Sequence, residues 1–319
     1  MPDMKLWGES MRTDHYFDSC GKGKIHYCTW LPEQQPTAVL QIVHGIAEHV
    51  ERYDDFANYL TGHGFAVVAE DHMGHGGSIG EDGVQGYFHG GWFAAVDDTY
   101  RLLKDTMSAY PDVPYILFGH SMGSFMARTI LAKYPDSGID AAIICGTGWQ
   151  PTFALPVLSK VLDGICKKNG EENPNPQLDQ MIFGGYTKGI ENVRTPKDWL
   201  TRDDAVVDAY ISDPLSGFVA SGGLLRDMMQ GIYYIQQKKH LASMKKHLPV
   251  FFIAGDKDPV GANGKGVKQA AEAFRKAGMI NVALKLYPDC RHEILNELNK
   301  QEVYEDITGW IATVTGLEA

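Results

Sequence analysis

Short apolar segments alternate with longer amphipathic segments along most of this chain, and this alternation constrains the fold most strongly. The apolar segments are rich in Val, Ile, Leu and Phe, which is typical of strands buried on both faces of a parallel sheet. They are residues 38–43, 66–69, 115–118, 141–145, 250–254 and 282–286. Segments with helical spacing lie between most of them, at 51–60, 92–108, 122–133, 266–277 and 303–314. The alternation predicts an α/β fold with a doubly wound sheet.

Two parts of the chain depart from this alternation, one near its start and one between the fourth and fifth apolar segments. Residues 12–18 and 24–31 alternate in polarity around the turn-forming segment 19–23, so they predict a β-hairpin. Between Cys145 and Val250 lie roughly a hundred residues, too many for a connection without structure of its own. We therefore expect a helical cap insertion at 149–240, with helical patterns at 155–166 and 221–239. The α/β core would then comprise 1–148 and 241–319.

Charge, apolar runs and cysteine spacing limit the partners and the cellular compartment that we expect for this protein. The formal net charge is −11, from 29 Lys and Arg against 40 Asp and Glu, so nucleic acid is not an expected partner. The segment Met1–Ser10 lacks the apolar core of a signal peptide, and no apolar run is long enough for a transmembrane helix. The five cysteines are scattered, which favours free thiols in a reducing compartment. We expect a cytoplasmic protein.

Ser121 is the candidate nucleophile. It is the centre of the Gly-x-Ser-x-Gly segment 119–123, which follows an apolar segment and precedes a helical pattern. This strand–turn–helix setting exposes a serine hydroxyl above the carboxyl edge of a sheet. The flanking glycines remove side chains that would clash across so tight a turn.

A serine needs a base to remove its proton, and the base needs a carboxylate to orient it. Two later apolar segments end close to suitable residues, Asp258 after the first and His292 after the second. Their order, serine then acid then histidine, is the one found in such folds. Asp256 and Asp289 are alternatives for the acid, and the segment 255–260 favours Asp258.

The negative charge that develops on an attacked carbonyl oxygen requires hydrogen-bond donors. The apolar segment 38–43 runs into a His-Gly element at 44–49, in the position expected for an oxyanion loop. We expect the backbone N–H groups of Ile46 and Met122 to form the oxyanion hole.

Taken together, these motifs closely resemble those of monoacylglycerol lipases and bacterial lysophospholipases. They are residues 44–49 with Arg52-Tyr53, and then 71–78, 119–123, 255–260 and 291–297. The resemblance implies the α/β-hydrolase fold, a mostly parallel eight-stranded sheet with flanking helices and a helical cap. It also implies Ser121, Asp258 and His292 as a triad, with Ile46 and Met122 as oxyanion donors. Ser124 departs from the pattern, because family members often have a glycine there.

Other polar residues have simpler interpretations. The segment Asp71–His75 lacks the further ligands of a metal centre, so no metal and no cofactor are expected. His120 is expected to pack under the elbow, with Glu48 and His49 ordering the oxyanion loop. Cys290 lies two residues before His292 and is expected to be a buried, inert thiol.

The cap is rich in apolar residues, and those on its inner face would form the acyl pocket. The candidates are Trp149, Phe153, Leu155, Ile182 and Phe183. The expected substrate is a small-molecule ester, above all a monoacylglycerol or a lysophospholipid. An esterase or amidase for aryl or cinnamoyl-type substrates, and a non-catalytic binding protein, remain alternatives. Transient contact of the cap with a membrane surface and the oligomeric state stay open.

Overall fold

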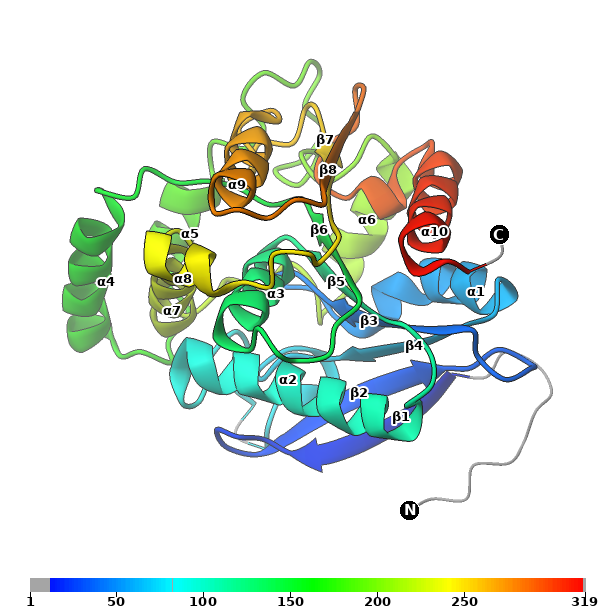
Figure 1. The fold of residues 1–319 in the computed structure, drawn as a ribbon. Helices are drawn as coiled ribbons and strands as arrows, with labels where there is room; N and C mark the ends of the chain where they lie inside the picture. Colours follow the sequence, from blue (N-terminus) through cyan, green and yellow to red (C-terminus); the bar gives the residue numbers. More distant parts are fainter. Residues whose placement is uncertain (1–11, 82, 318–319) are drawn as a thin grey trace.

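The computed structural model describes residues 12–81 and 83–317. The segment Met1–Ser10, for which no signal peptide is expected, lies outside the described residues. Within them, eight strands form one sheet in the order β1-β2-β4-β3-β5-β6-β7-β8 (Figure 1). The strands are β1 (Arg12–Asp18), β2 (Lys24–Trp30), β3 (Ala38–Val43), β4 (Phe65–Glu70), β5 (Tyr115–His120), β6 (Ala141–Cys145), β7 (Val250–Gly255) and β8 (Val282–Tyr287).

The sheet is mostly parallel, as expected. Only β2 pairs antiparallel with its neighbours, β1 and β4, while the remaining pairs are parallel. Because parallel strands share a direction, the carboxyl ends of β3, β5, β6, β7 and β8 lie at one edge of the sheet. In open α/β sheets that edge carries the ligand site. The segments that follow these strands are therefore brought together.

Helices cover both faces of the sheet (Figure 1). The side chains of β5 alternate between two hydrophobic clusters, with Leu117 in one and Ile116 and Phe118 in the other. The first cluster includes residues of α2 (Gly91–Ala109), α3 (Met122–Lys133) and α9 (Lys265–Lys276). The second includes residues of α1 (Asp54–Gly62) and α10 (Lys300–Thr315). Each central strand is thus buried on both faces, which explains its continuous apolar sequence.

Five helices lie between β6 and β7, namely α4 (Leu155–Asn169), α5 (Pro176–Phe183), α6 (Asp204–Ser212), α7 (Gly222–Ile235) and α8 (Lys238–Ser243), as counted over the described residues. α7 contacts α2, α3 and α4, so this segment joins the hydrophobic core on one side of the sheet. In the part of the chain that the structure describes, none of the helices has both the length and the apolarity needed to cross a membrane.

Three local expectations differ from the structure. β8 is only partly buried because it is an edge strand. The helical pattern at 51–60 begins as a 3₁₀ helix, η1 (Val50–Tyr53), before α1. The pattern at 221–239 divides into α7 and α8, because Gln236 turns its side chain to the backbone of Gln150 and Gln237 has extended dihedral angles.

Candidate active site

Ser121 occupies a strained turn between β5 and α3. Its φ of 53° and ψ of −120° lie outside the regions that non-glycine residues ordinarily adopt, and its backbone N–H donates to the carbonyl of Cys145 at 3.0 Å. The neighbouring Ser124 donates from Oγ to the carbonyl oxygen of Ser121 at 2.5 Å. The residue that departs from the family pattern therefore supports the turn.

The two glycines of the motif are required by close backbone contacts. A Cβ atom at Gly119 would lie 2.5 Å from the carbonyl oxygen of Gly123. A Cβ atom at Gly123 would lie 1.9 Å from the carbonyl oxygen of Val43, the last residue of β3. Neither position has room for a larger residue, so the elbow packs directly against the end of β3.

The expected acid and base are in contact. His292 Nδ1 and Asp258 Oδ1 are 3.0 Å apart, and both side chains are buried. The same oxygen of Asp258 accepts a hydrogen bond from the backbone of Val260 at 2.9 Å. The Asp256 carboxylate instead accepts a hydrogen bond from the backbone N–H of Asp289 at 2.8 Å. Of the three, Asp258 is the carboxylate that lies beside the histidine.

The ring of His292 is held by its surroundings. It lies 4.8 Å from the ring of His120 and 5.1 Å from the ring of Trp199, measured between centroids. Gly146, which follows β6, allows close approach, since a Cβ atom there would lie 3.1 Å from His292 Cε1. The imidazole is therefore packed by the last residue of β5 and by two parts of the segment between β6 and β7.

The segment after β3 lies against Ser121. A Cβ atom at Gly45 would lie 3.0 Å from Ser121 Cβ, and Ala47 has a φ of 54°. Ile46 and Met122 both line the cavity that contains Ser121 and His292. Met122 is also the first residue of α3, where backbone N–H groups have no partner within the helix. The two expected oxyanion donors are thus on the same side of the site.

A buried carboxylate organises this loop. Glu48 accepts hydrogen bonds from the Gly45 backbone at 2.5 Å, from Tyr53 at 3.0 Å and from Arg52 at 2.9 Å, and it lies 3.1 Å from His120 Nδ1. Burial alone would raise the pKa of Glu48, but His120 and Arg52 hold it well below its ordinary value. The ionised carboxylate therefore fixes the loop and the ring beneath it, as the sequence predicted for Glu48 and His120.

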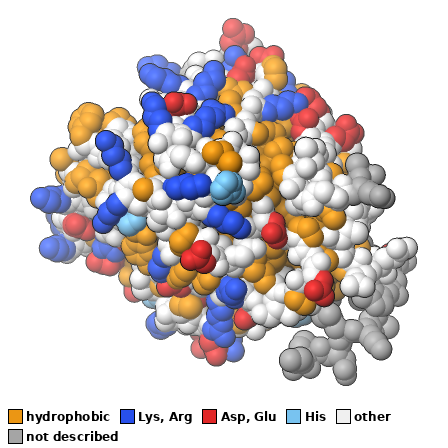
Figure 2. All heavy atoms as spheres, viewed as in Figure 1, with side chains coloured by type: hydrophobic (Ala, Val, Ile, Leu, Met, Phe, Trp, Pro, Cys, Tyr) orange, Lys and Arg blue, Asp and Glu red, His pale blue; other side chains and the backbone are white. Residues whose placement is uncertain are grey.

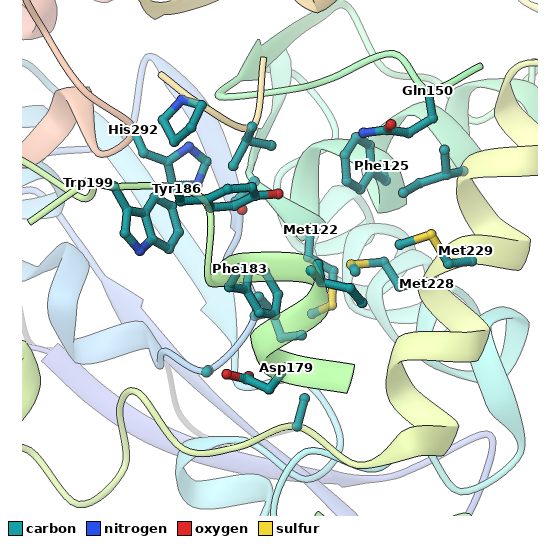
Figure 3. A pocket seen from close by; sticks show the side chains of 18 of the residues that line it. Met122, Phe125, Gln150, Asp179, Phe183, Tyr186, Trp199, Met228, Met229 and His292 are labelled. Carbon is teal, nitrogen blue, oxygen red and sulfur yellow. The ribbon is translucent and has the colours of Figure 1, made fainter. Parts of the chain in front are cut away.

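Ser121 lines a cavity of about 450 Å³, a volume within the range of small-molecule sites. Figure 3 shows side chains of this cavity, among them Met122 and His292. Four of the expected pocket residues line it, namely Trp149, Leu155, Ile182 and Phe183. Sequence reasoning did not single out its other apolar walls as pocket residues, among them Phe125, Tyr186, Trp199, Met228 and Met229. Phe125, Met228 and Met229 lie in helices, where lining residues and core residues have the same sequence pattern, so no sequence signal distinguishes them.

Phe153 is the exception among the expected pocket residues. Its side chain is 85% exposed and it does not line the cavity. It lies in the turn before α4, and this turn directs the ring to solvent while Leu155, two residues later, faces inward. Asp179 and Lys197 were also not expected in the pocket. Burial raises the pKa of the Asp179 carboxyl and lowers the pKa of the Lys197 ammonium.

Two further expectations concern side chains near the site. Cys290 is fully buried, its Sγ lies 3.1 Å from Asn299 Oδ1, and burial raises its pKa to about 11. The Asp71–His75 segment follows β4, and its His72 ring stacks on His44 with the ring centroids 4.0 Å apart. His72 Nε2 lies 3.1 Å from the His44 carbonyl oxygen, so this segment forms a hydrogen-bonded support beneath the oxyanion loop.

The mostly parallel sheet, the strained serine elbow and the buried histidine–carboxylate pair define an α/β-hydrolase that acts as a serine hydrolase. A family model, Hydrolase_4, described as "Serine aminopeptidase, S33", matches residues 34–299, and the chain belongs to this family.

Known proteins agree with this assignment. The chain is 29% identical to a monoacylglycerol lipase of Mycolicibacterium smegmatis, covering 95% of this chain and 98% of that protein. It is 27% identical to the human monoglyceride lipase, over 92% of this chain and 88% of the relative. A thermostable carboxyl esterase of Bacillus coagulans superposes with a TM-score of 0.88 at 31% identity, covering 95% and 99% of the two chains. The resemblance to monoacylglycerol lipases is confirmed, and the chain is an ester hydrolase.

Proposed function

We propose that Ser121, Asp258 and His292 form the catalytic triad. The observation that carries this proposal is the 3.0 Å contact between His292 Nδ1 and Asp258 Oδ1, beside the cavity that Ser121 also lines. With Nδ1 facing a carboxylate, Nε2 is the nitrogen free to accept a proton. The strained backbone of Ser121 presents its hydroxyl at the end of β5, where His292 also arrives from the end of β8.

The reaction follows from this arrangement. His292 removes the Ser121 proton as Oγ attacks the ester carbonyl, and the backbone N–H groups of Ile46 and Met122 stabilise the oxyanion. The alcohol leaves with the proton from His292. Water, activated by the same imidazole, then attacks the acyl-enzyme, releases the carboxylic acid and restores Ser121.

We further propose that the substrate carries one acyl chain, as a monoacylglycerol or a lysophospholipid does. The cavity walls are mainly aliphatic, aromatic and methionine side chains, which suit an alkyl chain. Asp179 and Lys197 supply polar groups for an alcohol or head group. The names of the relatives from M. smegmatis and human favour a monoacylglycerol.

Residues 149–240 are proposed to act as the cap over this cavity and to contact a membrane surface transiently. The exposed residues Phe153, Val157 and Val161 follow one another at intervals of four, with exposed fractions of 85%, 64% and 51%. Hydrophobic side chains gather with basic ones at the left edge of the molecule, where α4 lies (Figures 1 and 2). Exposed lysines of α4, Lys160, Lys167 and Lys168, add attraction to anionic lipids.

Labelling with a fluorophosphonate, followed by peptide mapping, tests the nucleophile. We expect the label on Ser121, none in Ser121→Ala, and unchanged labelling in the control variant Ser108→Ala, at an exposed serine away from the site. Hydrolysis of a monoacylglycerol should fall by several orders of magnitude in Ser121→Ala. Near-normal hydrolysis in that variant would overturn the triad, and a wild-type protein that takes no label would favour a non-catalytic binding protein.

A substrate panel tests the substrate class. Rates on a monoacylglycerol, a lysophospholipid, an aryl ester, a cinnamoyl ester and an aminoacyl amide should be highest for the first two. Since fold alone does not determine the substrate, a preference for the aryl or cinnamoyl ester, or for the amide, would reject the lipid assignment while leaving the triad intact.

A further inference from the structure

A second cluster of reactive side chains lies on the β1–β2 hairpin, outside the active site. Asp14 of β1 pairs directly with Cys28 of β2, and His26 is two residues away on the same face of β2. Carboxylate, imidazole and thiol groups therefore converge from two adjacent strands. None of the three residues lines the substrate cavity. Sequence spacing gave no sign of this cluster, since only the strand register brings Asp14 to the other two.

The three donor atoms form a compact triangle. Asp14 Oδ1 lies 3.0 Å from His26 Nε2 and 3.3 Å from Cys28 Sγ, and Cys28 Sγ lies 3.8 Å from His26 Nε2. Around a tetrahedral zinc ion, bond lengths of about 2.0–2.3 Å place ligand atoms about 3.2–3.6 Å apart. Each observed separation is within about 0.3 Å of that range. The three separations are therefore compatible with ligation of one ion.

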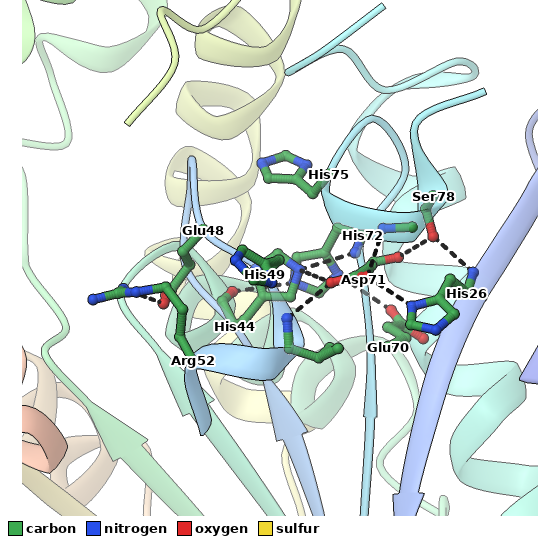
Figure 4. A network of polar contacts seen from close by, with 12 residues as sticks. His26, His44, Glu48, His49, Arg52, Glu70, Asp71, His72, His75 and Ser78 are labelled. Atoms are coloured by element: carbon green, nitrogen blue, oxygen red, sulfur yellow. Dashed lines mark hydrogen bonds and ion pairs between the residues drawn. The ribbon is translucent and has the colours of Figure 1, made fainter. Parts of the chain in front are cut away.

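The outer contacts of His26 suit a metal ligand. Its Nδ1 lies 2.7 Å from Asp71 Oδ2, and Asp71 is itself held by the backbone N–H groups of Val50 and Gly77 at 2.9 and 2.8 Å (Figure 4). A carboxylate on one ring nitrogen fixes the tautomer and leaves the other nitrogen to face a metal. Here Nδ1 faces the buried Asp71, and Nε2 faces Cys28 and Asp14.

The three donor atoms are open to solvent on one side, and acidic residues surround them. Cys28 is fully buried and His26 is 7% exposed, whereas the Asp14 side chain is 49% exposed, so solvent reaches the triangle on the Asp14 side. Arg12 pairs with Glu51 at 2.8 Å and with Asp54 at 3.3 Å, and its Nε also lies 4.0 Å from Asp14 Oδ1, so one cation faces three carboxylates. The surroundings therefore carry an excess of negative charge, which favours a bound cation.

We propose that Asp14 Oδ1, His26 Nε2 and Cys28 Sγ bind a zinc ion, with water as the fourth ligand. Sulfur, nitrogen and oxygen donors together suit Zn²⁺ rather than Mg²⁺ or Ca²⁺, which prefer oxygen alone. Binding forms a Zn–S bond as the Cys28 thiol loses its proton to solvent. The ion ties β1 to β2 and, through His26 and Asp71, to the segment after β4. Its role is to stabilise this edge of the sheet.

The same contacts could also be a hydrogen-bonded cluster without an ion, and cobalt binding separates the two. Titration of the tag-free, metal-stripped protein with Co²⁺ should produce ligand-field bands and a sulfur-to-cobalt charge-transfer band with a stoichiometry of one. A wild-type spectrum without the charge-transfer band would by itself overturn the proposal, and it requires no variant to fold.

Variants then identify the ligands. Asp14→Asn, His26→Gln and Cys28→Ser should each weaken Zn²⁺ binding by more than about 100-fold, beyond the 10–100-fold typical of outer contacts. The matched controls are Cys20→Ser in the hairpin turn and His15→Gln on the opposite face of β1. Both should bind Zn²⁺ as the wild type does. Zn²⁺ should raise the unfolding temperature of the wild type and the controls only. Equal affinity in Cys28→Ser would overturn the proposal.

Discussion

Arg52 and Glu293 form a bidentate ion pair, with Nη1–Oε1 and Nη2–Oε2 distances of 2.7 Å, although 241 residues separate them along the chain. Arg52 follows the oxyanion loop and Glu293 follows His292. The Glu293 side chain is buried and the Arg52 side chain is only 11% exposed, and the guanidinium also donates to Glu48 at 2.9 Å. This pair therefore joins the segment that holds the expected oxyanion donor to the segment that holds the expected base.

Removing the Arg52 charge should be costly, because it leaves Glu293 and Glu48 buried without their cation. We expect Arg52→Met to lower the free energy of unfolding by about 3–5 kcal/mol. The exposed pair Lys300–Asp55 is the control, and Lys300→Met should cost less than about 1 kcal/mol. Urea unfolding of both variants checks this. A similar decrease in the free energy of unfolding in the two variants would contradict a larger contribution from the Arg52 ion pair.

Asp258 and Asp256 allow a matched test of the acid. Asp258→Asn should reduce kcat by roughly 10⁴-fold, because an amide beside Nδ1 favours the wrong tautomer of His292. Asp256→Asn should change kcat only a few-fold, since that carboxylate accepts the backbone N–H of Asp289 instead. Steady-state kinetics on one monoacylglycerol gives kcat for both variants. A larger decrease in Asp256→Asn than in Asp258→Asn would assign the acid to Asp256.

His75 should make the fold sensitive to acid. Burial, together with His72, lowers the pKa of His75 to about 4, so the folded protein keeps this ring neutral while the unfolded chain protonates it near 6.5. Its contribution to stability is therefore complete above about pH 7 and is lost as the pH falls towards 4, by at most about 3 kcal/mol.

The comparison of His75→Phe with wild type isolates this effect, because the ring lies between Phe88 and Phe218, at centroid distances of 6.0 and 5.2 Å. We expect the free energy of unfolding of His75→Phe to fall less steeply between pH 7 and 5. The exposed His63→Phe should keep the wild-type slope. An unchanged slope in His75→Phe would mean that the buried ring takes up a proton in the folded state.

The exposed apolar residues before and along α4 should govern adsorption to lipid. Replacing Phe153, Val157 and Val161 together by Ser should weaken binding to anionic vesicles by about 10-fold or more. Hydrolysis of a soluble short-chain ester should stay unchanged. Ile280→Ser, at a residue 65% exposed outside the cap, is the control. Vesicle sedimentation measures the binding of both variants. Equal binding would contradict the proposed contact between the cap and the membrane.

Much of the architecture was predictable because it depends on local patterns. The runs at 38–43 and 141–145 became β3 and β6 with the same bounds, and 122–133 became α3. A strand buried on both faces is mostly apolar, with Gln41 the polar exception in β3, and a helix packed on a sheet shows one apolar stripe, so both can be recognised in the sequence. The partial burial of β8 and the break between α7 and α8 depend on contacts with segments distant in the sequence. A local sequence pattern does not contain that information.

The site divides in the same way. The sequence by itself determined the serine elbow, through the glycine requirement at 119 and 123, and the order of serine, acid and histidine. Only the tertiary structure brought Asp258 rather than Asp256 to His292, turned Phe153 to solvent and joined Arg52 to Glu293. It alone placed Asp14 beside His26 and Cys28. The glycines of the elbow follow from local steric demands, whereas contacts between distant segments follow from strand register and side-chain direction.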